Sequence, residues 1–342
     1  MERSRRGFLK AFGGGGALLG GAYVATRGVR GDRRPADLEE WPPSESSGRL
    51  SYWSWQHYWR SQAEAFQFDA DLEAIDSETV PARDQYRRLV DGETPDVVTL
   101  PTRQFERAVE NDLLASFDPE VVPFWPPRNE LQTHDESLYV REDGCYGVPQ
   151  TPMSYALAYH REELEEPSSW SLLWDESLTG RIGMPADPIL AGQVAALYTG
   201  QDPNDPDDVD AIREALETQR SLVGTYWTDW NDCWRAFRDA SIKAAVLPNP
   251  RMCLCSQDGT PIVMAEPNEG VLYGQNTLAI PKDASNPYTA LEFIDWGLEF
   301  KTGTDAMWTP EEWPLRPHRM LETDAREAYL EAAETVGIDG AE

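Results

Sequence analysis

Short apolar segments with the character of β-strands alternate along this chain with segments of helical periodicity, and this order most constrains its fold. An aromatic strand over 49–55 precedes helical patterns over 60–67 and 81–91, then a buried strand over 95–100 and a helix over 103–114. Such alternation is typical of a mainly parallel sheet covered by helices, with ligands at the carboxyl ends of its strands.

A second series of the same kind follows two extended segments, 145–149 and 155–159. Its predicted elements are strands over 181–184 and 243–247 and helices over 190–199, 207–223 and 229–240. The chain then returns through extended residues 270–273 and 277–281 to a helix over 287–300. We expect an α/β protein with two lobes, residues 49–152 plus 276–318 and residues 153–275 plus 319–342, and a cleft that closes by hinge motion.

The N-terminal segment resembles a signal for export by the twin-arginine (Tat) pathway. Residues 4–10 read SRRGFLK and precede a weakly apolar, glycine-rich stretch over 11–26. We expect residues 1–30 to be a signal or anchor that engages the Tat translocase and residues 31–48 to be a linker. The folded domain is then extracellular or at the cell surface; cleavage and retention of the signal both stay open.

The charge balance excludes one class of partner and indicates the solvent. The chain has 60 acidic and 30 basic residues, a formal net charge of −30, and lysine at only four positions. A nucleic-acid partner is therefore not expected, since such binding depends on neutralising phosphates. Strong acidity with scarce lysine favours a halophilic protein adapted to molar salt; an acidic mesophilic protein is the alternative.

Four cysteines could form one or two disulfides in an oxidising compartment: Cys145, Cys233, Cys253 and Cys255. The sequence does not choose their pairing, although a bridge from Cys253 to Cys255 is not expected because both point to one face of a strand. The four histidines show no paired ligand spacing, so we expect no metal and no cofactor.

Five stretches, in order, resemble the extracellular solute-binding proteins of ABC importers, specifically the spermidine/putrescine-binding family. They are LSYWSW (50–55), TPDVV (94–98), YGVP (146–149), SWSLLW with LTGRIG (169–183), and GTPI, PNEG and LAIP (259–281). The resemblance implies a type II periplasmic-binding-protein fold with a hinge of two crossing strands. It also implies a monomeric, non-enzymatic protein that passes a small solute to the permease subunits of an importer.

The candidate ligand-binding residues lie where strands end or cross. They are Trp55, Gln56, Thr102, Arg103, Tyr155, Asp187, Asn249, Tyr273 and Gln275. Trp55 keeps an aromatic ring of the family pattern, whereas Gln275 replaces an acidic anchor and Arg103 adds a positive charge. Asp187 is the one carboxylate that matches a family ligand position, and it could equally cap the helix that follows. A polyamine is therefore not favoured, and the solute stays open between a polyamine-like and another small polar molecule.

Two other functions compete with solute delivery. A secreted, salt-adapted glycoside hydrolase would need two acids in one cleft, but the predicted strand-end loops supply only Asp187. A surface-tethered sensor would bind the solute without transporting it. Trp227, Trp230 and Trp234 have helical spacing and are expected to pack in a core rather than to form a ligand cage.

Overall fold

The computed structural model describes residues 48–54, 58–117, 138–142, 144–228, 230–248, 261–300, 315–317 and 323–338. The chain divides into two compact units, Met1–Gln150 with Asn276–Gly303 and Thr151–Gln275 with Thr304–Glu342. By this division the described residues 315–317 belong to the second unit, and the predicted lobe boundaries stay a prediction. No helix within the described ranges has the length and apolar character that crossing a membrane requires.

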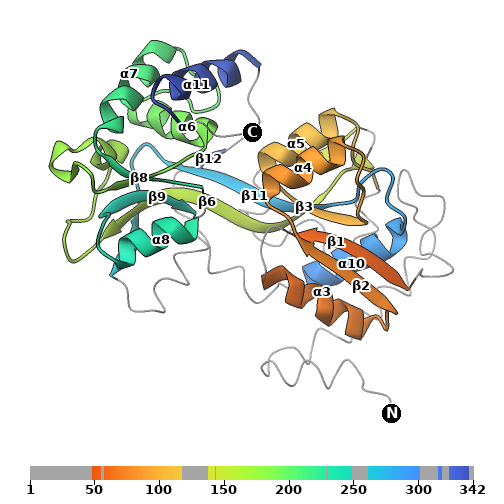
Figure 1. Cartoon of the computed structure of the whole chain (residues 1–342). Coiled ribbons are helices and arrows are strands. Elements are labelled where there is room, and N and C mark those ends of the chain that lie inside the picture. Colours follow the sequence, from red (N-terminus) through yellow and green to blue (C-terminus); the bar gives the residue numbers. More distant parts are fainter. Residues whose placement is uncertain are drawn as a thin grey trace. The chain divides into compact units, whose positions relative to one another are not determined.

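The first unit is built on a sheet in which each strand is followed along the chain by a helix. In sheet order the strands are β2 (Ala74–Thr79), β1 (Arg49–Ser54), β3 (Val97–Pro101) and the second half of β11 (Val271–Ala279). Strand β1 pairs in parallel with β2 and β3, and β11 is antiparallel to β3. Helices α3 (Tyr58–Asp69) and α10 (Pro287–Phe300) cover one face, and α4 (Ala82–Val90) and α5 (Thr102–Glu110) cover the other (Figure 1).

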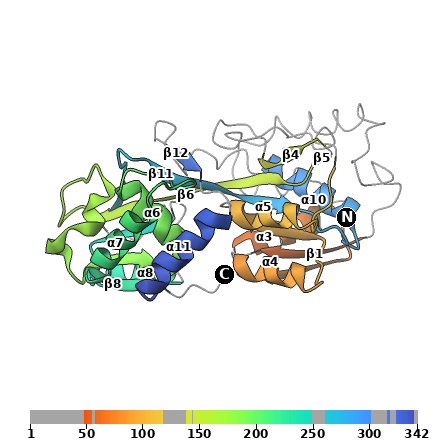
Figure 2. The same ribbon diagram turned by 90° about the horizontal axis from the view of Figure 1, so that it is seen from above.

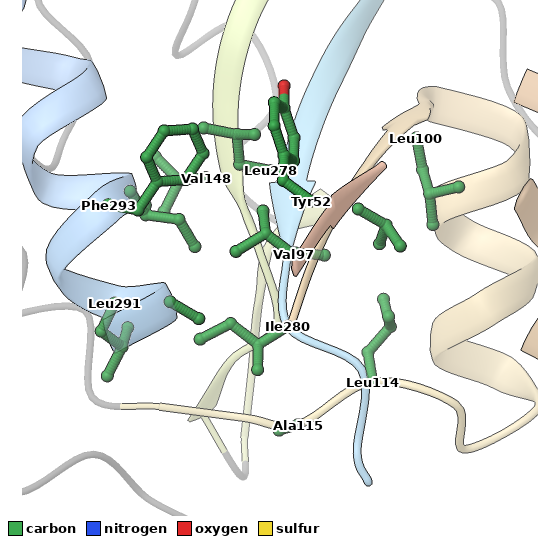
Figure 3. Packing of buried hydrophobic residues seen from close by; sticks show 14 of the residues in the cluster. Tyr52, Val97, Leu100, Leu114, Ala115, Val148, Leu278, Ile280, Leu291 and Phe293 are labelled. Atoms are coloured by element: carbon green, nitrogen blue, oxygen red, sulfur yellow. The ribbon is translucent and has the colours of Figure 1, made fainter. Parts of the chain in front are cut away.

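The core of the first unit fills both faces of this sheet. Tyr52, Val148 and Leu278 gather with Phe293 on the α10 side, as Figure 3 shows. The rings of Tyr52 and Phe293 lie 5.0 Å apart between centroids. On the other face, Phe105 of α5 is fully buried. Burial of this aromatic and aliphatic surface is the main stabilising contribution in the unit.

A buried carboxylate connects three elements at the amino-terminal edge of the same sheet. Asp96, which directly precedes β3, accepts hydrogen bonds from Ser51 N (2.7 Å) and Ser51 Oγ (2.8 Å) on β1. It also accepts from Asn286 N (2.7 Å) and Asn286 Nδ2 (3.0 Å), directly before α10. Four hydrogen bonds compensate the desolvation of a charge that is only 1% exposed, which gives the aspartate of the TPDVV stretch a structural role.

The second unit repeats the arrangement with a different strand order. In sheet order its strands are β6 (Val148–His160), β9 (Ala244–Pro248), β7 (Ile182–Pro185) and β8 (Val223–Trp227). In addition, β10 (Ile262–Ala265) pairs with β6, and β12 (Leu315–Pro317) pairs with the first part of β11. Helices α6 (Pro188–Tyr198), α7 (Val209–Arg220) and α11 (Thr323–Thr335) lie together on one face (Figures 1 and 2). Helix α8 (Trp230–Arg238) packs on the other.

Most of the predicted elements are present, but the structure contains others as well. Strands β2, β8, β10 and β12 and helix α11 were not predicted. Residues 221–223, assigned to a helix, lie beyond the end of α7. Trp227 is the last residue of β8, whereas Trp234 lies in α8, so the two residues are not on one helix as their spacing suggested. Both rings are nonetheless buried in one cluster with Phe237, as the core interpretation required.

The N-terminal signal, residues 31–47 of the linker, Cys253 and Cys255 lie outside the described residues. Cys145 and Cys233 are both buried, in different units, and the Cys145 thiol donates to the Gly147 carbonyl (3.2 Å). The formation of one or two disulfides stays a prediction, and their pairing stays open.

Candidate functional site

In the first unit, the predicted residues Thr102 and Arg103 lie where β3 gives way to α5. Thr102 is the first residue of the helix and is 4% exposed, and Arg103 is half-buried. The preceding residue, Pro101, provides no side-chain cap for the helix. The other two candidates of this unit, Trp55 and Gln56, directly follow β1 and lie outside the described residues.

The same edge of the sheet carries four buried neutral polar side chains that the sequence did not single out. We refer to Ser54, Gln62, Gln150 and Asn276 as the polar cluster. Side chains two residues apart on a strand share a face. Ser54, Gln150 and Asn276 therefore lie on the α10 side, because each is two positions from a core residue there: Tyr52, Val148 and Leu278 (Figure 3).

The strand pairing and one side-chain contact place the polar cluster at the carboxyl ends of the parallel strands. Ser54 is the last residue of β1, and Asn276 pairs with Pro101 at the end of β3. Gln150 Nε2 lies 3.5 Å from Gln62 Oε1 of α3, a long hydrogen bond. Exposed fractions are 2%, 6%, 2% and 2% for Ser54, Gln62, Gln150 and Asn276. Sequence reasoning missed the three strand residues because an isolated polar residue on a strand looks like part of a solvated face, and it missed Gln62 because that residue lies in a helix.

In the second unit, strand pairing brings the ends of β7, β8 and β9 to one edge, beside the middle of β6. Pro185 of β7 pairs with Trp227 of β8, and Pro248 of β9 pairs with Tyr155 of β6. Two predicted residues, Tyr155 and Asp187, are therefore at this edge, since Asp187 follows β7 by two residues. Asn249 directly follows β9 and lies outside the described residues.

Asp187 caps helix α6. Its Oδ1 accepts hydrogen bonds from the backbone amides of Ile189 and Leu190, both at 3.0 Å. Proline at the first helical position completes a regular helix start. Of the two roles that the sequence allowed for Asp187, the structure therefore contains the helix cap.

Tyr273 and Gln275 lie two residues apart on β11 and contact each other. The amide Nε2 of Gln275 donates to the Tyr273 hydroxyl oxygen. Both side chains are buried, at 6% and 2% exposure. Burial raises the pKa of Tyr273 well above its ordinary value and outweighs the opposite effect of the Gln275 hydrogen bond. The pair therefore offers neutral hydrogen-bonding groups at physiological pH.

Within the part of the chain that the structure describes, no three His, Cys, Asp or Glu side chains form a group that could hold a metal ion.

Comparison with solved structures shows which fold the chain adopts. A spermidine/putrescine ABC transporter substrate-binding protein from Streptococcus pneumoniae superposes with a TM-score of 0.69 at 14% identity, covering 84% of this chain and 98% of that one. An ABC transporter substrate-binding protein from Bradyrhizobium japonicum gives 0.66 at 19% identity, covering 84% and 98%. The fold is that of the type II periplasmic binding proteins.

The sequence comparisons identify the family. The model of the bacterial extracellular solute-binding proteins matches residues 63–317, most of the chain, and the chain belongs to this family. Spermidine/putrescine-binding periplasmic protein 1 of Haemophilus influenzae is 27% identical over 161 residues, 46% of this chain and 44% of that protein. The match thus spans less than half of this relative. The family is one of solute-binding proteins rather than of enzymes, in agreement with the expectation from the sequence.

Proposed function

We propose that this protein captures a small polar solute outside the cell and delivers it to the permease subunits of an ABC importer. The observation that carries the proposal is the family match over residues 63–317, combined with buried polar side chains at the strand ends of the first unit. In α/β sheets ligands bind at the carboxyl ends of parallel strands. The polar cluster and Thr102 occupy such ends in the first unit. In the second unit, Tyr155 of β6 pairs with Pro248 at the end of β9.

The proposed mechanism is closure of the two units on the solute. A ligand favours a closed form only by the free energy that it gains there and not in the open form. Contacts from the second unit, for which Tyr273 and Gln275 are the candidates, would supply this difference. The permease subunits would then recognise the closed form.

Further parts of the proposal concern the export pathway and the salt concentration in which the protein works. The SRRGFLK segment supports export by the Tat translocase, with the protein tethered or released as a monomer outside the cell. The composition supports function in molar salt. A sensor would bind the solute in the same way but would have a different protein partner. Genes for a permease and an ATPase beside the gene for this chain would favour transport over sensing.

The test is a thermal-shift screen of a metabolite library, followed by small-angle scattering with the solute that stabilises the protein. We expect the solute to raise Tm and reduce the radius of gyration, without being converted to a product. The variant Tyr273→Ala should weaken binding by roughly one to a few kcal/mol through lost contact area. Tyr198→Ala, at a half-exposed ring stacked on Trp174, is the matched control and should bind normally.

Two results would contradict the proposal: no solute in the library stabilises the protein, or the stabilising solute is chemically converted. Equal loss of affinity in both tyrosine variants would instead show that Tyr273 acts through folding.

A further inference from the structure

The chemistry of the polar cluster defines the class of solute, provided that the protein binds a solute as proposed above. Its members are a hydroxyl and three carboxamides, and none carries a charge at any pH at which the protein is folded. They are contributed by three strands and one helix, so the arrangement is not a local feature of one loop. Buried polar groups of this kind are retained in proteins when they make hydrogen bonds.

The buried carboxylates of the described part of the first unit lie elsewhere. Asp96 is at the opposite edge of the sheet, where Ser51 and Asn286 donate four hydrogen bonds to it. Glu106 and Asp295 are inside helices α5 and α10 rather than at strand ends. The charged side chain closest along the chain to Thr102 is Arg103, which is cationic.

The second unit shows the same pattern at its predicted site. Asp187 Oδ1 accepts two backbone hydrogen bonds at the start of α6, which gives this carboxylate a structural role. Tyr273 and Gln275 contribute a neutral phenol and an amide. Tyr155, half-buried opposite Pro248, adds a second phenol.

An ammonium group that leaves water for such surroundings loses hydration, and amide oxygens restore only part of it. Sites for diammonium and triammonium ions therefore place carboxylates against the charged ends. Hydroxyl and carboxamide groups instead match solutes with hydroxyl, carbonyl or carboxylate groups, because they both donate and accept hydrogen bonds.

We propose that the solute is a neutral or anionic polar molecule rather than a polyamine, and that the side chains of Gln62, Gln150 and Asn276 select it by hydrogen bonding.

The experiment compares two sets of probes on the full chain by isothermal titration calorimetry. One set is spermidine and putrescine; the other is a library of neutral and anionic metabolites that includes myo-inositol, glucose and succinate. We expect at least one member of the second set to bind with Kd below about 100 μM, and neither polyamine to bind at this affinity. Titration at low and at molar KCl prevents salt from masking an electrostatic interaction.

Each other outcome overturns a different statement. If spermidine or putrescine binds with Kd below about 100 μM, the inference on solute class is wrong and the proposed function stands. If neither set binds, the proposed function itself fails.

Substitutions test the assignment to the polar cluster. Gln150→Ala should weaken binding of the identified solute about tenfold or more, since a buried hydrogen bond is lost. Gln219→Ala is the matched control: Gln219 is also a fully buried glutamine, but it donates to the Leu173 carbonyl inside the second unit's core (3.3 Å). It should lower Tm and leave Kd unchanged. Unchanged affinity in Gln150→Ala would remove Gln150 from the set of selecting residues and overturn that assignment.

Discussion

The carboxylate of Asp187 shows how one residue can satisfy a family pattern and a local structural need at once. It stands two residues after β7, a position suited to a ligand contact, and it also occupies the N-cap of α6. The structure contains the capping hydrogen bonds, which stabilise the first turn by satisfying two amides that lack helical partners.

A pair of substitutions measures this role. Asp187→Ala should lower the free energy of unfolding by about 1 kcal/mol, because the cap is lost, whereas Asp187→Asn should cost much less since asparagine also caps helices. Urea unfolding of both variants measures the difference. Unchanged stability in Asp187→Ala together with lost solute binding would show that Asp187 is a ligand contact and not chiefly a cap.

Among individual residues, the sequence pointed to only some members of the candidate site. The ends of predicted strands led to Thr102 and Asp187, because the end of a buried apolar run is visible in a sequence. Tyr155 and Tyr273 were predicted from their positions on the two crossing strands. The sequence did not lead to Gln62 or Gln150, since Gln62 lies in a helix, and the face that Gln150 presents depends on which strands become neighbours. Trp55, Gln56 and Asn249 remain predictions.

Strands and helices were predictable from the sequence where one or both of their faces are fully buried. Strands β3, β7 and β9 are buried apolar runs, and they were predicted nearly to their ends. Strand β2 was missed because it forms the edge of its sheet, with mainly half-buried or exposed residues and a single large apolar side chain, Ile75. Helix α11 was missed because small alanines supply much of its buried face.

The docking of α11 depends on a glycine in α6. A Cβ atom added to Gly192 would lie 2.5 Å from Cδ1 and 2.7 Å from Cγ of Tyr329, whose ring is fully buried. The Tyr329 hydroxyl is held by the Pro203 carbonyl at 3.0 Å, so the ring has little freedom to move aside. The two helices therefore approach as closely as they do because residue 192 has no side chain.

We expect Gly192→Ala to destabilise the protein by about 1–3 kcal/mol through overpacking, despite the higher helix propensity of alanine. Gly297→Ala in α10 is the matched control, because its nearest contact would be Leu278 Cδ1 at 4.0 Å. That variant should be neutral or more stable by a few tenths of a kcal/mol. Thermal unfolding of both would show the contrast, and equal stability of the two variants would refute the steric explanation.

For the whole molecule, the order of five short motifs was enough to predict the fold class and the family, since the motifs mark where strands and crossings fall. The identity of the solute was not accessible in the same way, because it depends on which side chains the crossings bring to one edge. The net charge of −30, in contrast, allows a physical prediction from the sequence alone.

Excess negative charge destabilises the compact state by self-repulsion, and salt screens it. The Debye length falls from roughly 10 Å at 0.1 M to about 3 Å at 1 M salt, so repulsion between separated carboxylates is largely removed. Salt also weakens ion pairs, but those of Arg213 with Asp210 and Arg235 with Asp232 involve exposed carboxylates and contribute little. The repulsive contribution therefore dominates.

Raising KCl from 0.1 M to 2 M should increase Tm by roughly 3–4 °C, which corresponds to about 2–3 kcal/mol for a chain of this size. Scanning calorimetry across the series measures the shift. Sucrose at matched osmolality is the control, because it favours the compact state by exclusion without screening charge, and its effect should be clearly smaller than that of KCl. A Tm that is constant or falls as KCl rises would show that the acidic surface is not an adaptation to salt, since screening would then bring no stability.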